Sequence, residues 1–162
     1  MAQFDLVRML SPVGPDDFDR AWFDRAPLRI GRNDAAYYRS LCSLDALDEF
    51  LSVCQPHYAK CFAIDARRKI GTEEFAGPDG RVDPLRLFGL FEEGATVVYR
   101  EVEDHFPALA ALCRSAEAHF HTPFVATIYW APKGGRCFPI HYDAKDVYAL
   151  QVAGSKRWRL YE

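Results

Sequence analysis

Residues 138–161 decide the fold, and they read FPIHYDAKDVYALQVAGSKRWRLY. Apolar, β-branched and aromatic residues alternate with polar ones along this stretch, which is typical of β-strands. Four strands are expected in it and just before it, at 124–130, 138–143, 147–152 and 156–161. Residues 153–155 are a short connection that favours an antiparallel hairpin. The end of the sequence is therefore predicted to be all-β.

His141 and Asp143 are the first candidates for chemistry in this stretch. Two residues apart on a strand, they would point to the same face. Together they supply two of the three protein ligands of a 2-His-1-carboxylate iron site. Residues 144–162 contain no histidine, so the domain is expected to be incomplete at Glu162 and the source of the third ligand is open. A surface ion pair between His141 and Asp143 is the alternative interpretation.

Lys156 is the second candidate. It alternates with Trp158 and Leu160, so it shares an apolar face, where a lysine without a partner is costly. An iron oxygenase that uses 2-oxoglutarate needs a cation for the far carboxylate of that co-substrate, and a lysine can provide it. The alternative is a surface lysine beside Arg157 and Arg159 that keeps its charged end in water.

A second histidine pair, His119 and His121, lies at a predicted helix end before Pro123. Residues two apart on a helix diverge, so no metal site is expected there.

The first three quarters of the chain are predicted to be mainly helical. Helices are expected from Pro15, from Ser43 to Val53, from Pro84 (capped by Asp83) to Glu93, and over 106–119, with strands at 58–64 and 95–102 and an irregular lead-in over 1–14. The predicted class is α+β. Residues 1–122 would form a helical entry region and 123–162 the first half of a barrel, within one structural unit.

Composition excludes several classes of protein. The chain has 162 residues, a length typical of one domain, and 49% of them are hydrophobic. The net charge of −3 argues against a broad surface for nucleic acid or anionic membrane, and no apolar run approaches a membrane span.

Cysteine usage favours a cytoplasmic location with reduced thiols. The five cysteines, which show no CxxC spacing and follow no signal peptide, are Cys42, Cys54, Cys61, Cys113 and Cys137. They are interpreted as small buried hydrophobic residues. A metal role is the alternative, because Cys54 and Cys61 are seven residues apart and Cys137 is near His141 in the sequence.

Residues 138–161 resemble the JmjC/cupin-type ribosomal oxygenases, with looser similarity at 17–28, 94–98 and 106–109. The resemblance implies a double-stranded β-helix that holds Fe(II), uses 2-oxoglutarate and hydroxylates a protein side chain, an arginine or histidine of a ribosomal protein. It makes His141 and Asp143 iron ligands and places Lys156 at the far carboxylate of 2-oxoglutarate.

The resemblance also assigns residues of the preceding strand. Tyr129 matches the tyrosine of the family's N-x-Y-x-TP segment, which contributes to the co-substrate pocket. Thr127 stands where that segment usually has asparagine, and Ala131 replaces its threonine.

Two further hypotheses stay open. The chain could be a degenerate cupin that binds a partner protein without catalysis, or a homo-oligomer in which another chain completes the barrel. It could also hold a cupin metal site of another class. With two ligands only, residues 1–162 alone are expected to turn over 2-oxoglutarate poorly.

Overall fold

The computed structural model describes residues 3–135 and 138–161. These residues form α-helices and an antiparallel sheet, so the predicted α+β class is confirmed. They group into two compact units, each built from separate stretches of chain. We call residues 1–44, 103–124 and 148–162 the helical unit, and residues 45–102 and 125–147 the sheet unit. The expected boundary between residues 122 and 123 stays a prediction.

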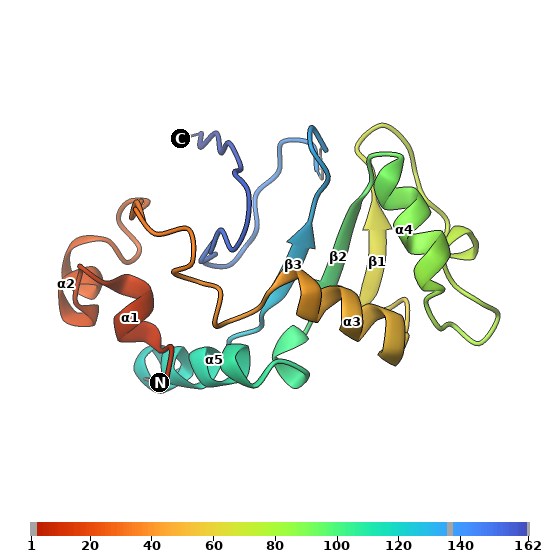
Figure 1. Cartoon of the computed structure of the whole chain (residues 1–162). Coiled ribbons are helices and arrows are strands. Elements are labelled where there is room, and N and C mark those ends of the chain that lie inside the picture. Colours follow the sequence, from red (N-terminus) through yellow and green to blue (C-terminus); the bar gives the residue numbers. More distant parts are fainter. Residues whose placement is uncertain (1–2, 136–137, 162) are drawn as a thin grey trace. The chain divides into compact units, whose positions relative to one another are not determined.

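The sheet unit is built on three antiparallel strands (Figure 1). They are β1 (Cys61–Ile64), β2 (Thr96–Arg100) and β3 (Thr127–Trp130), in the order β1-β2-β3. Four of the five residues of the central strand β2 are buried, as its run of β-branched and aromatic residues predicts. All three strands lie within segments that the sequence predicts to be extended.

One face of this sheet is covered by helices α3 (Leu44–Cys54) and α4 (Pro84–Glu92). Phe50 of α3 stacks on Tyr99 of β2, with ring centroids 5.3 Å apart. Phe91 of α4 lies 4.7 Å from Trp130 of β3. Trp130 pairs with Val97, two residues from Tyr99, so both helices lie on the same face.

The opposite face of the sheet carries Phe62, Val98 and Tyr129, which are paired across the three strands. Thr127 is two residues from Tyr129 and therefore shares this face. Two of the predicted co-substrate residues thus lie on the side of the sheet away from α3 and α4.

Helix α4 begins where the sequence predicts. The Asp83 carboxylate accepts hydrogen bonds from the backbone N–H groups of Leu85 and Arg86, and Pro84 occupies the first helical position. The helix ends at Gly94, which has a φ of +111° and would bring a Cβ within 2.7 Å of Arg67. Glycine is therefore favoured there by the backbone conformation, whereas the end of the Arg67 side chain could move aside for a Cβ.

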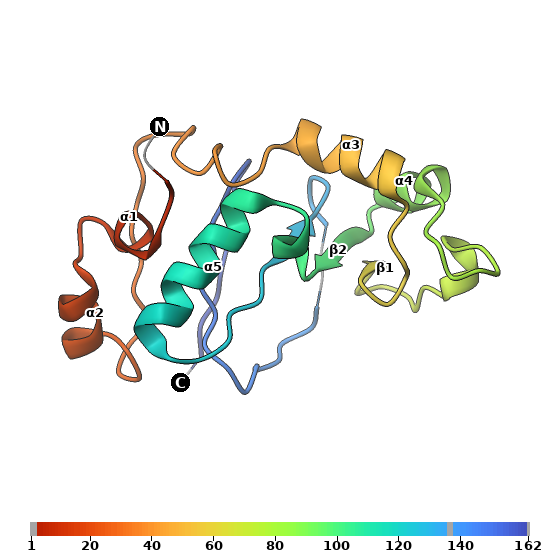
Figure 2. The same cartoon turned by 90° about the horizontal axis from the view of Figure 1, so that it is seen from below.

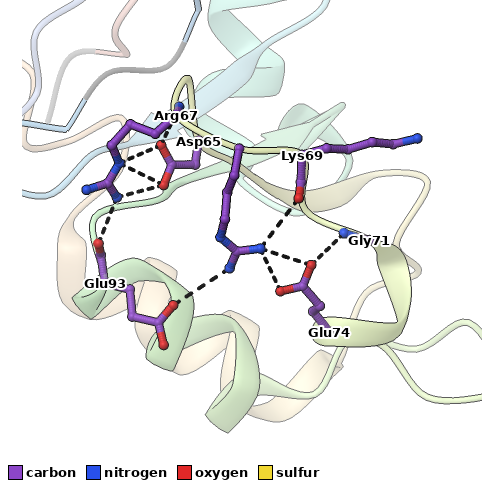
Figure 3. Close-up of polar contacts among 7 residues, drawn as sticks. Asp65, Arg67, Lys69, Gly71, Glu74 and Glu93 are labelled. Carbon is purple, nitrogen blue, oxygen red and sulfur yellow. Dashed lines mark hydrogen bonds and ion pairs between the residues drawn. The ribbon is translucent and has the colours of Figure 1, made fainter.

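Figure 3 shows the polar contacts that join the end of β1 to the end of α4. Arg67 donates to both carboxylate oxygens of Asp65, at 2.6–3.0 Å, and to the Glu93 carbonyl oxygen at the helix C-terminus, at 2.8 Å. Arg68 donates to Glu74 at 2.8 Å. The Arg67 hydrogen bonds lower the pKa of Asp65 to about 2.

This low pKa predicts how the Asp65→Asn substitution changes stability with pH. Ionised Asp65 stabilises the fold fully above its unfolded pKa, near 3.9, and this contribution is lost as the pH falls through about 2. The difference in unfolding free energy between wild type and Asp65→Asn should therefore shrink between roughly pH 4 and 2. Urea unfolding at a series of pH values measures it. Arg67→Gln should reduce the change in unfolding free energy between pH 4 and 2. An unchanged pH dependence in that variant would contradict the assignment of the low Asp65 pKa to Arg67.

The helical unit contains α1 (Leu6–Leu10), α2 (Pro15–Ala21) and α5 (Pro107–Phe120), which lie next to one another (Figures 1 and 2). The Leu6 N–H donates to Ser115 Oγ of α5 at 2.8 Å. Phe18 of α2 meets Phe120 of α5 edge to face, with centroids 6.2 Å apart. The helix expected over 106–119 is confirmed, with α5 shifted by one residue at each end, and the helix expected from Pro15 is confirmed at its start but ends at Ala21, before the end expected at Ala26–Pro27.

Residues 1–14 were expected to be irregular. This prediction is wrong for residues 6–10, which form α1. Asp5 caps this helix by accepting from the Arg8 N–H at 2.9 Å. Leu6, Met9 and Leu10 are buried.

Short 3₁₀ turns also occur at Thr72–Glu74 and Val102–Asp104.

The strands expected over 138–143, 147–152 and 156–161 are not formed. Residues 138–161 are all described and contain no strand; bends occupy 139–140, 144–145 and 153–154, the last in place of the expected hairpin. A strand satisfies its backbone groups through a neighbouring strand, so an alternating pattern by itself does not produce one. In the part of the chain that the structure describes, β1 and β3 are the outer strands of the sheet.

No helix within residues 3–135 and 138–161 is long and apolar enough to cross a membrane.

Candidate metal and co-substrate site

His141 and Asp143 lie in the sheet unit, in a segment without helix or strand that follows a bend at residues 139–140. His141 Nδ1 is 2.8 Å from the carbonyl oxygen of Pro139. Because a carbonyl oxygen can only accept, Nδ1 must carry the hydrogen in this contact, which leaves the Nε2 lone pair available. Metal-binding histidines are commonly oriented in this way by a carbonyl or carboxylate behind the ring.

The Asp143 carboxylate and the His141 ring are both exposed to solvent. Imidazole nitrogen and carboxylate oxygen are the donor types of a 2-His-1-carboxylate iron site, so these two residues fit part of such a site. No group of three metal-binding side chains occurs among residues 3–135 and 138–161. The described chain therefore offers two protein donors of the three.

A line of aromatic rings connects this pair to strand β3. Tyr129 is 48% exposed, and its ring centroid lies 6.3 Å from that of Phe138. Phe138 in turn lies 5.0 Å from the ring of His141. The structure thus brings Tyr129 and His141 to one neighbourhood, with Phe138 between them. Sequence analysis missed Phe138 as a site residue, although its alternation with Ile140 and Tyr142 was a usable signal.

Thr127 is the first residue of β3 and pairs with Arg100 of β2. Its side chain is partly buried. It is two residues from Tyr129 on the strand, so the two side chains share a face, as their assignment to the same pocket requires.

Lys156 belongs to the helical unit and is exposed. Its ammonium nitrogen lies 4.9 Å from the centroid of the Trp158 ring, a cation–π distance. Lys156 and Trp158 are close together as expected, but Lys156, Trp158 and Leu160 are all exposed, so the apolar face expected from their alternation is not buried. Its expected role at a carboxylate stays a prediction.

The other histidine pair has structural contacts. His119 Nε2 is 2.8 Å from the Asp19 carboxylate, which ties the end of α5 to α2. His121 follows the helix in the left-handed conformation, with φ at +53°. His119 therefore contacts a carboxylate of α2, and His121 is the residue at which α5 ends.

The described cysteines are unbridged thiols. Cys42, Cys61 and Cys113 are buried, and burial raises the pKa of Cys61 to about 12 and that of Cys113 to about 11. These thiols are therefore protonated and unreactive at neutral pH. The interpretation as buried hydrophobic residues is confirmed for these three, whereas Cys54 is exposed. Cys137 lies outside the described residues.

Comparison with known proteins indicates the family. The family model described as "JmjC domain" matches residues 103–162, which include His141, Asp143 and Lys156. A bifunctional lysine-specific demethylase and histidyl-hydroxylase NO66 of Drosophila willistoni is 30% identical over 154 residues, which cover 94% of this chain and 20% of that protein. Residues 103–162 match the JmjC family. The three-stranded antiparallel sheet of the chain is consistent with part of the JmjC fold.

Similar JmjC relatives occur outside flies of that genus. The NO66 protein of Aedes aegypti is 30% identical over 153 residues, covering 94% of this chain and 24% of that protein. The NO66 protein of Dictyostelium discoideum is 28% identical over 158 residues, covering 97% and 30% respectively. The chain thus spans between a fifth and a third of the length of these curated relatives.

Proposed function

We propose that this chain is part of an Fe(II)- and 2-oxoglutarate-dependent oxygenase that hydroxylates a protein side chain. The observation that carries the proposal is the His141–Asp143 pair, with the His141 ring oriented by the Pro139 carbonyl so that Nε2 can bind a metal. Iron and 2-oxoglutarate are the metal and co-substrate that JmjC domains generally use.

In this proposal His141 Nε2 and one Asp143 oxygen hold Fe(II), which when bound supplies the redox chemistry with O₂. Lys156 neutralises the far carboxylate of 2-oxoglutarate as a point charge. The Tyr129 hydroxyl donates a hydrogen bond to the co-substrate, and Thr127 contributes a shorter polar group than the asparagine usual in the family. With Ala131 in place of a threonine, this pocket would have one polar side chain fewer than is usual in the family.

A third metal ligand is needed for a facial site. We propose that it is a histidine that follows residue 162 in a longer protein, or a histidine of a second copy in a homo-oligomer. Two ligands leave the metal weakly held, so residues 1–162 alone should release little succinate from 2-oxoglutarate.

The substrate class is proposed from the relatives. Their name includes histidyl-hydroxylase, and the sequence resemblance points to ribosomal proteins. We therefore propose a histidine of a ribosomal protein as the target, with an arginine as the second choice. The proposed compartment is the cytoplasm, and no direct nucleic-acid or membrane partner is proposed.

Two alternatives follow from the two-ligand site. A protein-binding module without catalysis is favoured by the absence of a third donor among residues 3–135 and 138–161. A cupin metal site of another class would bind metal through the same pair without needing 2-oxoglutarate.

Anaerobic titration with Fe(II), with and without 2-oxoglutarate, separates these functions. Imidazole is added to supply the missing ligand. We expect a visible absorption band that requires 2-oxoglutarate, and its loss in Lys156→Gln but not in Lys145→Gln, which removes the same charge eleven residues earlier in the sequence. Metal binding that is equally strong with and without 2-oxoglutarate would favour a cupin metal site of another class. The absence of metal binding would favour the protein-binding module.

A further inference from the structure

The Lys156 side chain has a specific neighbour that its assignment to a carboxylate does not use. Its ammonium nitrogen lies 4.9 Å from the centroid of the Trp158 ring. The two residues are separated by Arg157 in a segment without helix or strand, and the contact itself places their side chains together. Trp158 is 56% exposed, so its ring is accessible to whatever approaches Lys156.

A cation over an indole ring is attracted by the negative face of the ring, and tryptophan is the strongest aromatic partner. A lysine ammonium has three N–H donors on a flexible four-carbon stem. The ring covers one side of the ammonium, and a carboxylate would approach it from a direction that the ring does not cover. The contact also restricts the stem before any ligand arrives, which reduces the entropy lost on binding.

We propose that Trp158 is a positioning residue that holds the Lys156 ammonium for the far carboxylate of a dicarboxylate co-substrate. This inference rests on the proposed function, because it assigns Lys156 to 2-oxoglutarate. It goes beyond that function by giving a role to Trp158 and by explaining how an exposed lysine acts as a defined point charge. Trp158 acts through Lys156 and makes no contact with reacting atoms.

The proposal predicts a graded effect on affinity for 2-oxoglutarate. Trp158→Leu should raise the Kd about two- to fivefold, which is the range of an exposed cation–π contact. Trp158→Phe should raise it less, because phenylalanine keeps a ring with a weaker negative face. Arg157→Gln and Arg159→Gln remove charges on either side of Trp158 and should have smaller effects than Lys156→Gln.

Isothermal titration of the protein with 2-oxoglutarate, in the presence of Mn(II) and imidazole, measures these values. Circular dichroism of each variant checks the fold, and Trp158→Phe keeps the test valid if Trp158→Leu does not fold. Equal Kd values for wild type, Trp158→Leu and Trp158→Phe would overturn the inference. If Lys156→Gln also leaves the Kd unchanged, the proposed function fails as well, so the two failures are distinguishable.

A second readout tests the contact without any co-substrate. The chain has five lysines, which can be reductively methylated with ¹³C-formaldehyde and resolved by NMR. The Lys156 methyl signal, identified by its loss in Lys156→Arg, should be shifted upfield by the indole ring current. Trp158→Leu should return it to the position of the other lysines, whereas Arg159→Gln should not move it. A signal that is not shifted in the wild type would overturn the inference.

Discussion

Asp143→Ala is expected to weaken Fe(II) binding by at least about 100-fold, because removal of groups that merely orient a ligand already costs 10- to 100-fold. The substitution removes one of two protein donors and leaves His141 alone. Competition with a coloured iron chelator under anaerobic conditions gives the affinity.

Asp146→Ala is the matched control for this loss. It removes the same charge from the same exposed segment, three residues away. Similar affinity losses in the two variants would mean that iron is attracted by general negative charge, and the His141–Asp143 site would be refuted.

Leu87→Ala is expected to destabilise the chain by about 2–5 kcal/mol, the usual cost of a leucine-to-alanine cavity in a core. Leu87 is fully buried on α4, which packs against β1 and β2. A loss of this size is a large part of the stability of an ordinary domain, so partial unfolding at room temperature is expected. Urea unfolding followed by circular dichroism measures it.

Leu85→Ala on the same helix is the control, since Leu85 is 83% exposed. It should change the unfolding free energy by less than about 0.5 kcal/mol. Equal effects of the two substitutions would show that α4 does not pack against the sheet as described.

The helices that could be predicted are those with local signals. Asp83 and Pro84 start α4 and Gly94 ends it, and each of these residues acts on the backbone next to it. Helix α1 was missed because it has five residues and its stability depends on distant packing, such as the bond from Leu6 to Ser115. The apolar spacing of Leu6, Met9 and Leu10 was the available signal.

The strands expected over 138–161 show the opposite error. Alternation predicts which side chains would share a face, but a strand also needs a neighbour for its backbone groups. That requirement is non-local, and no pattern within the segment can reveal it.

For the candidate site, residue types were predictable and surroundings were not. The spacing of His141 and Asp143 indicated a metal-binding pair from donor chemistry alone. The carbonyl that orients His141 comes from Pro139, two residues away across a bend, and the ring beside it comes from Phe138. Neither contact follows from the geometry of the strand that was expected there.

The order of the three strands also sets how firmly the candidate site is held. The amides of β2 are paired on both sides, so they should be the slowest in the sheet unit to exchange with deuterated water. Strand β3, which carries Thr127 and Tyr129, is paired with β2 along one edge. The β3 amides that point away from β2 should exchange faster than those of β2. The residues proposed to bind the co-substrate therefore lie on a strand with lower local stability than β2.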